Sequence, residues 1–201
     1  MLSTSSQASA KQWTYADYCD LDDEERYEIM EGKLIPISAG LPGPGRQHVE
    51  ATSEIFAQIS HFLRGKPCRA YHAPCDVILP DEGEDDDQAH TVLQPDIFVL
   101  CDLSKFKAHG CVGAPDMAIE VLSPYSISRD ICEKKYLYEK HGVQEYWIVD
   151  PANHVVYVYL LEEGHYREVI HIIASSRSEP ITCSVLPGLA VDMQAVFDRM
   201  L

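Results

Sequence analysis

The chain has 201 residues, of which 46% are hydrophobic and 24% charged, so disordered, collagen-like, coiled-coil and disulfide-miniprotein classes are excluded. This length suits one globular domain with a full core, which we expect over residues 13–201 after a flexible tail over residues 1–12. Sixteen Lys and Arg residues against 32 Asp and Glu residues give a net charge of −16. That charge argues against nonspecific binding to nucleic acids or anionic membranes through a broad basic face.

The apolar runs are short, and the longest extends from Val155 to Leu161. A membrane span needs about 18 to 20 apolar residues, so we expect no membrane partner. The N-terminus lacks the basic start and apolar stretch of a secretory signal, which predicts a cytoplasmic protein. The seven cysteines are scattered and partly placed in apolar segments, so we expect reduced core thiols. The absence of a CxxC pair argues against structural zinc.

Periodicity and turn residues predict an α/β fold with one mixed central sheet flanked by helices. In chain order, the predicted elements are a helix over 14–21, a hairpin of strands over 26–30 and 33–38, a helix over 47–63, a strand over 70–79, a solvated acidic loop over 81–87, strands over 97–101 and 117–122, a helix over 128–141, a strand over 145–150, a hairpin of strands over 155–161 and 166–173, and a helix over 192–200. Thr14 and Asp17 have the spacing of a capping box. Gly142 is a stop signal for the helix before it.

Two acidic residues interrupt apolar strands. Asp96 opens the strand over 97–101, and Glu120 lies within the strand over 117–122. An ionised carboxylate in such a strand is costly unless a cation or several hydrogen-bond donors face it. Alternation along a strand places Glu120 on the face shared with Ala118 and Leu122.

The helix over 128–141 carries a complementary polar stripe. Asp130, Lys134 and Tyr138 are spaced four residues apart and therefore share one side of this helix. Two strand carboxylates and a lysine suit phosphodiester hydrolysis. The carboxylates of Asp96 and Glu120 would hold Mg²⁺, which polarises the phosphoryl oxygen and acidifies a water, and the ammonium would offset the charge of the transition state.

Several motifs occur together in one order. They are Arg26-Tyr27-Glu28-Ile29-Met30-Glu31-Gly32-Lys33-Leu34, His48, Gln94-Pro95-Asp96, Glu120-Val121-Leu122-Ser123-Pro124, Asp130 with Glu133-Lys134 and Tyr138, and Gly142-Val143-Gln144-Glu145-Tyr146-Trp147-Ile148-Val149-Asp150-Pro151. From about Trp13 to Asp192 the chain resembles the Uma2 family, a DUF820 group of restriction-endonuclease-like nucleases. The resemblance implies a PD-(D/E)XK nuclease core with an added N-terminal helix and hairpin and a C-terminal hairpin.

The resemblance also implies metal-dependent cleavage of a nucleic acid, with Asp96 and Glu120 as ligands of Mg²⁺, or of Mn²⁺ in its place. One position departs from the family pattern, because Leu122 stands where the E-x-K element has lysine. The catalytic lysine would then come from the following helix as Lys134. Glu28 would add a further carboxylate, and Tyr138 would steady Lys134 or the attacking water.

Each of these residues also has a structural interpretation. Asp96 can cap a turn at the start of its strand, and Glu120 can form a structural ion pair with Lys134. Glu28 can pair with Arg26 or Lys33. His48, an accessory candidate, can be a solvated or capping residue at the start of its helix. Tyr146 and Trp147 are expected to pack in the core.

The net charge opposes the approach of a polyanion, so contacts with DNA must be local. The candidate cations are Arg64, Lys66, Arg69, Lys105, Lys107, Arg129 and Lys135. A homodimer would join two such patches into one groove. The main hypothesis is therefore a Mg²⁺-dependent DNA endonuclease. The alternatives are an inactive nuclease-fold module that binds a protein partner and an enzyme that hydrolyses a smaller phosphodiester.

Overall fold

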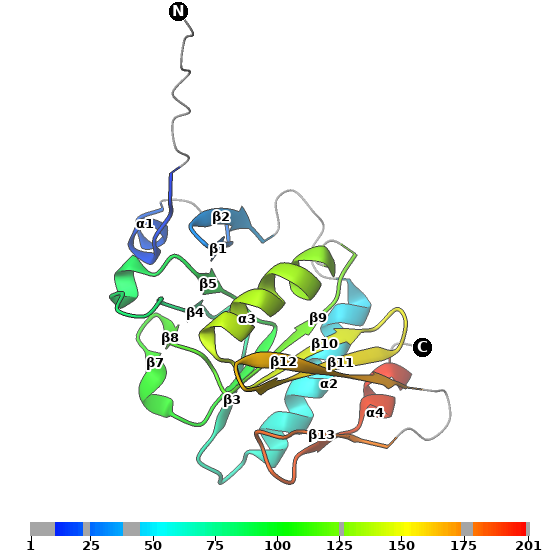
Figure 1. Cartoon of the computed structure of the whole chain (residues 1–201). Coiled ribbons are helices and arrows are strands. Elements are labelled where there is room, and N and C mark those ends of the chain that lie inside the picture. Colours follow the sequence, from blue (N-terminus) through cyan, green and yellow to red (C-terminus); the bar gives the residue numbers. More distant parts are fainter. Residues whose placement is uncertain (1–10, 22–24, 38–44, 125–126, 174–178, 200–201) are drawn as a thin grey trace, which may run out of the picture.

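A computed structural model describes residues 11–21, 25–37, 45–124, 127–173 and 179–199 (Figure 1). It contains two six-stranded sheets, named here sheet A and sheet B, and one two-stranded sheet. Residues 1–10 of the predicted tail, the last residue of the predicted strand over 33–38, residues 39–44 after it, and the last residue of the helix predicted over 192–200 lie outside the described residues. No helix in the described ranges combines the length and the apolar character needed to cross a membrane.

Sheet B is the mixed central sheet that the sequence predicts. Its strands lie in the order β12-β11-β10-β9-β6-β3, where β9 and β10 are parallel and all other neighbours are antiparallel. The strands are β3 (Arg69–His72), β6 (Ile97–Leu100), β9 (Met117–Val121), β10 (Glu145–Asp150), β11 (Val155–Glu162) and β12 (His165–Ile172).

Of the strands of sheet A, the sequence predicted only the N-terminal hairpin correctly. Its order is β2-β1-β5-β4-β8-β7. The strands are β1 (Tyr27–Met30), β2 (Lys33–Pro36), β4 (Val77–Ile78), β5 (Val92–Leu93), β7 (Phe106–Lys107) and β8 (Gly110–Val112). Four of these strands have only two or three residues, too few for a periodic pattern. The single strand predicted over 70–79 is wrong, because β3 and β4 belong to different sheets and Pro74 lies between them.

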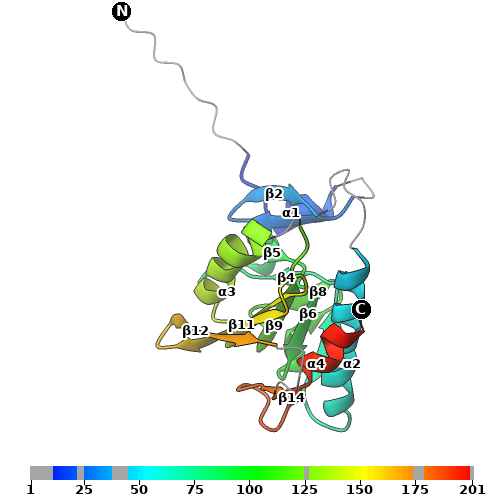
Figure 2. The same ribbon diagram turned by 90° about the vertical axis from the view of Figure 1, so that its right-hand side faces the viewer.

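Helices cover both faces of sheet B (Figures 1 and 2). Helix α2 (Arg46–Phe62) and helix α4 (Met193–Asp198) pack on one face, and α3 (Lys135–His141) packs on the other. Glu120 shares the α3 face with Ala118 and Leu122, as predicted. The two-stranded sheet of β13 (Ile181–Thr182) and β14 (Ala190–Val191) closes the α2 side.

The structure confirms a predicted helix cap and corrects the start of a predicted helix. The capping box is confirmed at α1 (Tyr15–Cys19), where Asp17 N–H donates to Thr14 Oγ1 and Thr14 N–H donates to Asp17 Oδ2. The α-helix predicted over 128–141 instead begins as a π-helix, η3 (Arg129–Lys134). Within it, the Asp130 carbonyl accepts a hydrogen bond from the Tyr146 hydroxyl at 3.0 Å.

The remaining connections contain two short 3₁₀ turns and a disulfide that the sequence did not predict. The turns are η1 (Asp86–Gln88), which includes the last two residues of the predicted acidic loop, and η2 (Leu103–Lys105). The prediction of reduced thiols is wrong for Cys68 and Cys101, which form a disulfide. The antiparallel register of β3 and β6 pairs Arg69 with Leu100, so the next pair of positions, Cys68 before Arg69 and Cys101 after Leu100, also lies face to face.

Candidate active site

Asp96 and Glu120 lie on neighbouring strands of sheet B. The pairing of Ile97 with Ile119 places Asp96, one residue before β6, opposite Glu120 near the end of β9. Glu120 is 3% exposed, whereas the Asp96 side chain keeps 18% of its surface in contact with solvent. The sheet register therefore places two acidic residues that are 24 positions apart in the sequence on neighbouring strands, close enough for the charge of Asp96 to help raise the pKa of Glu120.

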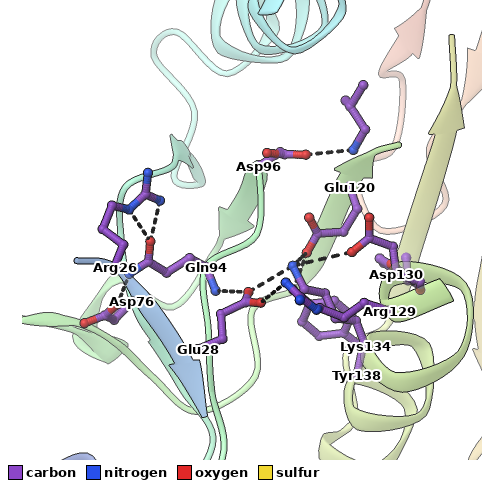
Figure 3. A network of polar contacts seen from close by, with 12 residues as sticks. Arg26, Glu28, Asp76, Gln94, Asp96, Glu120, Arg129, Asp130, Lys134 and Tyr138 are labelled. Carbon is purple, nitrogen blue, oxygen red and sulfur yellow. Dashed lines mark hydrogen bonds and ion pairs between the residues drawn. The ribbon is translucent and has the colours of Figure 1, made fainter. Parts of the chain in front are cut away.

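Lys134 lies at the centre of a buried group of charges (Figure 3). Its Nζ is 2.8 Å from Glu120 Oε1, 2.9 Å from Glu28 Oε1 and 3.7 Å from Asp130 Oδ1. All four side chains are at most 7% exposed. We call Glu28, Glu120, Asp130 and Lys134 the Lys134 cluster. Tyr138, one turn beyond Lys134, donates its hydroxyl to Glu120 Oε1 at 3.0 Å.

The two sheets both contribute to this cluster. Glu120 comes from β9 of sheet B, whereas Glu28 comes from β1 of sheet A. Glu28 Oε1 also accepts a hydrogen bond from the backbone N–H of Gln94 at 2.9 Å. Arg129 is 4.0 Å from Glu28 Oε2 and keeps 26% of its side chain exposed. The candidate site is therefore a junction between the sheets, with a partly exposed arginine at its margin.

Asp96 is held by one of its two carboxylate oxygens. Its Oδ2 accepts hydrogen bonds from Val121 N–H at 2.8 Å and from His48 Nε2 at 3.1 Å. Burial works against the protonated form of His48, but the hydrogen bond and charge of Asp96 raise the pKa of His48. His48, in the first turn of α2, therefore contacts the candidate site. These two hydrogen bonds hold the Asp96 side chain, and not the capping of a turn that was its structural interpretation.

The charges of the Lys134 cluster do not balance. Burial would lower the pKa of Lys134, but Glu120, Glu28 and Asp130 hold it well above its usual range, so the side chain is an ammonium. Burial raises the pKa of Glu120 well above its usual range, and its acidic neighbours add to the shift. Burial and Glu120 likewise keep Tyr138 a neutral phenol by raising its pKa. One buried ammonium and the partly exposed Arg129 face three buried carboxylates, so the cluster favours a further proton or cation.

The donor set fits a hard divalent cation such as Mg²⁺. Lys134 and Tyr138 both bond to Oε1 of Glu120, and no described residue donates to its Oε2. In the same way, no residue in the described part of the chain donates to Oδ1 of Asp96. Across these ranges no group of three or more His, Cys, Asp or Glu side chains is placed to hold a metal alone. A site of two carboxylates completed by water is within the range that Mg²⁺ uses in proteins.

Most of the predicted DNA contacts lie elsewhere. Arg64 and Lys66 follow the C-terminal end of α2, and a 17-residue helix places them about 25 Å from the end that carries His48. Arg69 pairs with Leu100, at the opposite end of β6 from Asp96. Of the seven predicted cations, Arg129 is the one that contacts an acidic residue of the cluster among the described interactions.

The other three cations have no described contact with Asp96 or with the Lys134 cluster. Lys105 donates to the carbonyl of Ala114, and Lys107 lies on β7 at the edge of sheet A. Lys135 Nζ lies 4.6 Å from the centre of the Tyr159 ring. The sequence alone could not separate these cations from Arg129, because their distance from the site depends on the fold.

Sequence reasoning missed four residues that support the site. Asp130 belongs to the predicted polar stripe but was not assigned to the site, although its side chain is buried beside Lys134. Arg26, Asp76 and Gln94 form a hydrogen-bonded chain that leads to Glu28 (Figure 3). Arg26 and Gln94 stood in the quoted motifs, which was the available signal, but Asp76 had none.

The comparisons with known proteins agree with this architecture. A search of the curated proteins gives no match. The solved structures include a putative nuclease belonging to DUF820 from Anabaena variabilis ATCC 29413, with 23% identity and a TM-score of 0.72, over 94% of this chain and 99% of that chain. This likeness confirms the nuclease-type α/β fold. The family model of Uma2, described as putative restriction endonuclease, matches residues 14–194, and the chain therefore belongs to the Uma2 family.

Proposed function

We propose that the protein is an endonuclease that hydrolyses phosphodiester bonds of DNA with Mg²⁺, or Mn²⁺ in its place. Asp96 and Glu120 would hold the metal, and Lys134 would assist the reaction. The observation that carries the proposal is a buried ammonium among three carboxylates, next to Asp96, in which Asp96 and Glu120 each keep one oxygen without a described donor.

When bound, the metal would act as a Lewis acid on the phosphodiester and lower the pKa of a water molecule. Lys134 is held as an ammonium by its carboxylate neighbours, so it cannot take up a proton and acts through its charge. Its role is to offset the negative charge that develops on the phosphoryl group in the transition state. Tyr138 and Glu28 hold Lys134 and Glu120 in place.

Contact with DNA must be local, because the whole chain carries a charge of −16. Arg129 supports such a contact, since it lies at the margin of the Lys134 cluster and is partly exposed. A binding mode with few phosphate contacts predicts weak affinity and a shallow dependence on salt. The homodimer expected from the sequence stays a prediction.

The test is a cleavage assay at low ionic strength with plasmid, single-stranded and branched DNA, and with a small phosphodiester in parallel. We expect Mg²⁺- or Mn²⁺-dependent cleavage of DNA that Asp96→Asn and Glu120→Gln abolish, while Arg64→Ala, far from the site, leaves it intact. Cleavage of the small diester alone would reassign the substrate. Intact substrates in every arm would contradict the proposed activity.

The acidic surface favours one second candidate, a nuclease-fold module without activity that binds a protein. Six of the seven predicted cations make no described contact with the candidate site, so a polyanion gains little from them. This candidate predicts that no metal binds and that a basic protein partner is retained at low salt. Calorimetric titration of Mg²⁺ and Mn²⁺ into the wild type separates the two candidates.

A further inference from the structure

The chain crosses between sheets A and B at two places that meet beside the candidate site. The first crossing joins β3 to β4 and contains Asp76, and the second joins β5 to β6 and contains Gln94 and Asp96. The two crossings are bonded to each other, because Ala73 N–H donates to the carbonyl oxygen of Asp96 at 3.2 Å. The position of Asp96 therefore depends on the hydrogen bonds that hold these two crossings together.

Gln94 holds the two crossings together through its backbone N–H and both polar atoms of its side chain. Its backbone N–H donates to Glu28 Oε1 at 2.9 Å, and its side-chain Nε2 donates to Asp76 Oδ1 at 2.7 Å and to the Tyr18 hydroxyl at 3.5 Å. Its Oε1 accepts hydrogen bonds from Nε and Nη2 of Arg26. Gln94 is only 8% exposed, so an unpaired group here would cost the desolvation of a buried polar atom.

The link from Gln94 to Asp96 is short and stiff. Pro95 stands between them, and its ring fixes its own φ angle while restricting Gln94 to extended conformations. A displacement of Gln94 must therefore move Asp96, two residues on. The same displacement would move the N–H group that holds Glu28 against Lys134.

We infer that Gln94 is a positioning residue for the candidate active site, held by Arg26 and Asp76 and acting through Glu28 and Asp96. The inference rests on the proposed function, because it assigns Gln94 a role in that same site. Partners of metal ligands typically change metal affinity or activity by about 10- to 100-fold when they are removed. The side-chain links of Gln94 are expected to have an effect of this size.

The test reverses the polarity of the bond between Gln94 and Asp76. Gln94→Glu keeps the acceptor for Arg26 but turns a carboxylate oxygen toward the carboxylate of Asp76. Asp76→Asn is the control, because its amide oxygen still accepts from Gln94 Nε2. The double variant Gln94→Glu/Asp76→Asn restores one donor and one acceptor with their order exchanged.

The first measurement is Mn²⁺ affinity by calorimetry. We expect Gln94→Glu to weaken binding about 10-fold or more, Asp76→Asn to stay within about threefold of the wild type, and the double variant to recover most of the loss. Affinity of Gln94→Glu equal to that of the wild type, or a double variant no better than the single one, would overturn the inference. Should Gln94→Glu not fold, recovery of folding and binding in the double variant supports the pairing, and failure to recover contradicts it.

The second measurement needs no metal and is amide hydrogen exchange. Val121 N–H donates to Asp96, so its exchange reports the position of that carboxylate. We expect Gln94→Glu to speed exchange at Val121, but not at Ser184 and Val185, whose N–H groups donate to the distant Glu145. Equal acceleration at all three would mean general destabilisation and would overturn the inference. If the wild type binds no Mn²⁺, the proposed function fails, and the exchange rates still decide the role of Gln94.

Discussion

Glu120 and Glu145 are buried glutamates on the neighbouring strands β9 and β10, and their surroundings differ in charge. Glu145 is 0% exposed and receives neutral donors, namely Trp147 Nε1 at 2.7 Å on Oε1 and the N–H groups of Ser184 and Val185 at 2.7 and 3.0 Å on Oε2. Glu120 instead has Lys134 and Tyr138 on one oxygen.

This difference in surroundings distinguishes Glu145, a structural carboxylate, from Glu120, a candidate metal ligand. The donors of Glu145 are backbone N–H groups, the Trp147 indole and also the Cys183 thiol, at 3.3 Å from Oε2, so this residue anchors the segment before β14 to sheet B. Glu120 shares its one cation with Glu28 and Asp130 and keeps an oxygen without a described donor. Burial alone is therefore a poor sign of function, whereas an excess of buried charge of one sign is a good one.

The largest expected effect concerns Lys134. Lys134→Met leaves Glu28, Glu120 and Asp130 without their ammonium, which should lower the free energy of unfolding by about 3 to 5 kcal/mol in urea denaturation. The double variant Lys134→Met/Glu120→Gln removes one of the stranded charges and should recover a clear part of this loss. A double variant less stable than Lys134→Met would contradict the charge account.

Glu145→Gln tests whether the hydrogen bonds of Glu145 stabilise the fold without affecting the metal site. The amide turns a donor toward either the Trp147 indole or the N–H groups of Ser184 and Val185, so we expect a loss of about 3 kcal/mol in the free energy of unfolding. Metal binding of the folded variant should match that of the wild type. A neutral effect on stability would show that these donors contribute little.

Glu120→Gln should act on stability in the opposite direction. The amide oxygen still accepts from Lys134 and Tyr138 while the excess charge disappears, so we expect a gain of about 1 kcal/mol at pH 8. The raised pKa of Glu120 means that the native state holds this proton more tightly than the unfolded state does. The wild type therefore loses stability as pH rises above the usual glutamate range, and the gain of the variant should vanish below it. Thermal unfolding across pH checks this dependence, and a gain independent of pH would contradict it.

The smallest expected effect concerns Arg129. Arg129→Ala should weaken DNA binding modestly and reduce the slope of log affinity against log salt by about one, as expected for one lost phosphate contact. Arg64→Ala is the matched control, since Arg64 lies beyond the far end of α2. Equal effects of the two substitutions in fluorescence anisotropy would place the DNA contact elsewhere.

The residues of the candidate site carry clearer signals in the sequence than the residues that support it. Glu120 and Lys134 could be singled out from the sequence because a charge within an apolar element breaks the local pattern. Sheet B could be predicted because its strands are long enough to show a pattern. Glu145 opens its strand with the same kind of charge, but the two backbone donors that give it a structural role lie 39 and 40 positions away, so local sequence could not reveal that role. Asp76 was missed because β4 and β5, which frame its contact with Gln94, have two residues each.

The most direct test is calorimetric titration of Mg²⁺ and Mn²⁺ into the wild type, Asp96→Asn, Glu120→Gln and Glu145→Gln. We predict that the wild type binds in the micromolar to millimolar range with release of protons, because Glu120 must ionise to bind the cation. Asp96→Asn and Glu120→Gln should lose this binding, and Glu145→Gln should keep it. No binding to the wild type, or equal binding to all four proteins, would contradict the assignment of Asp96 and Glu120 as a metal site.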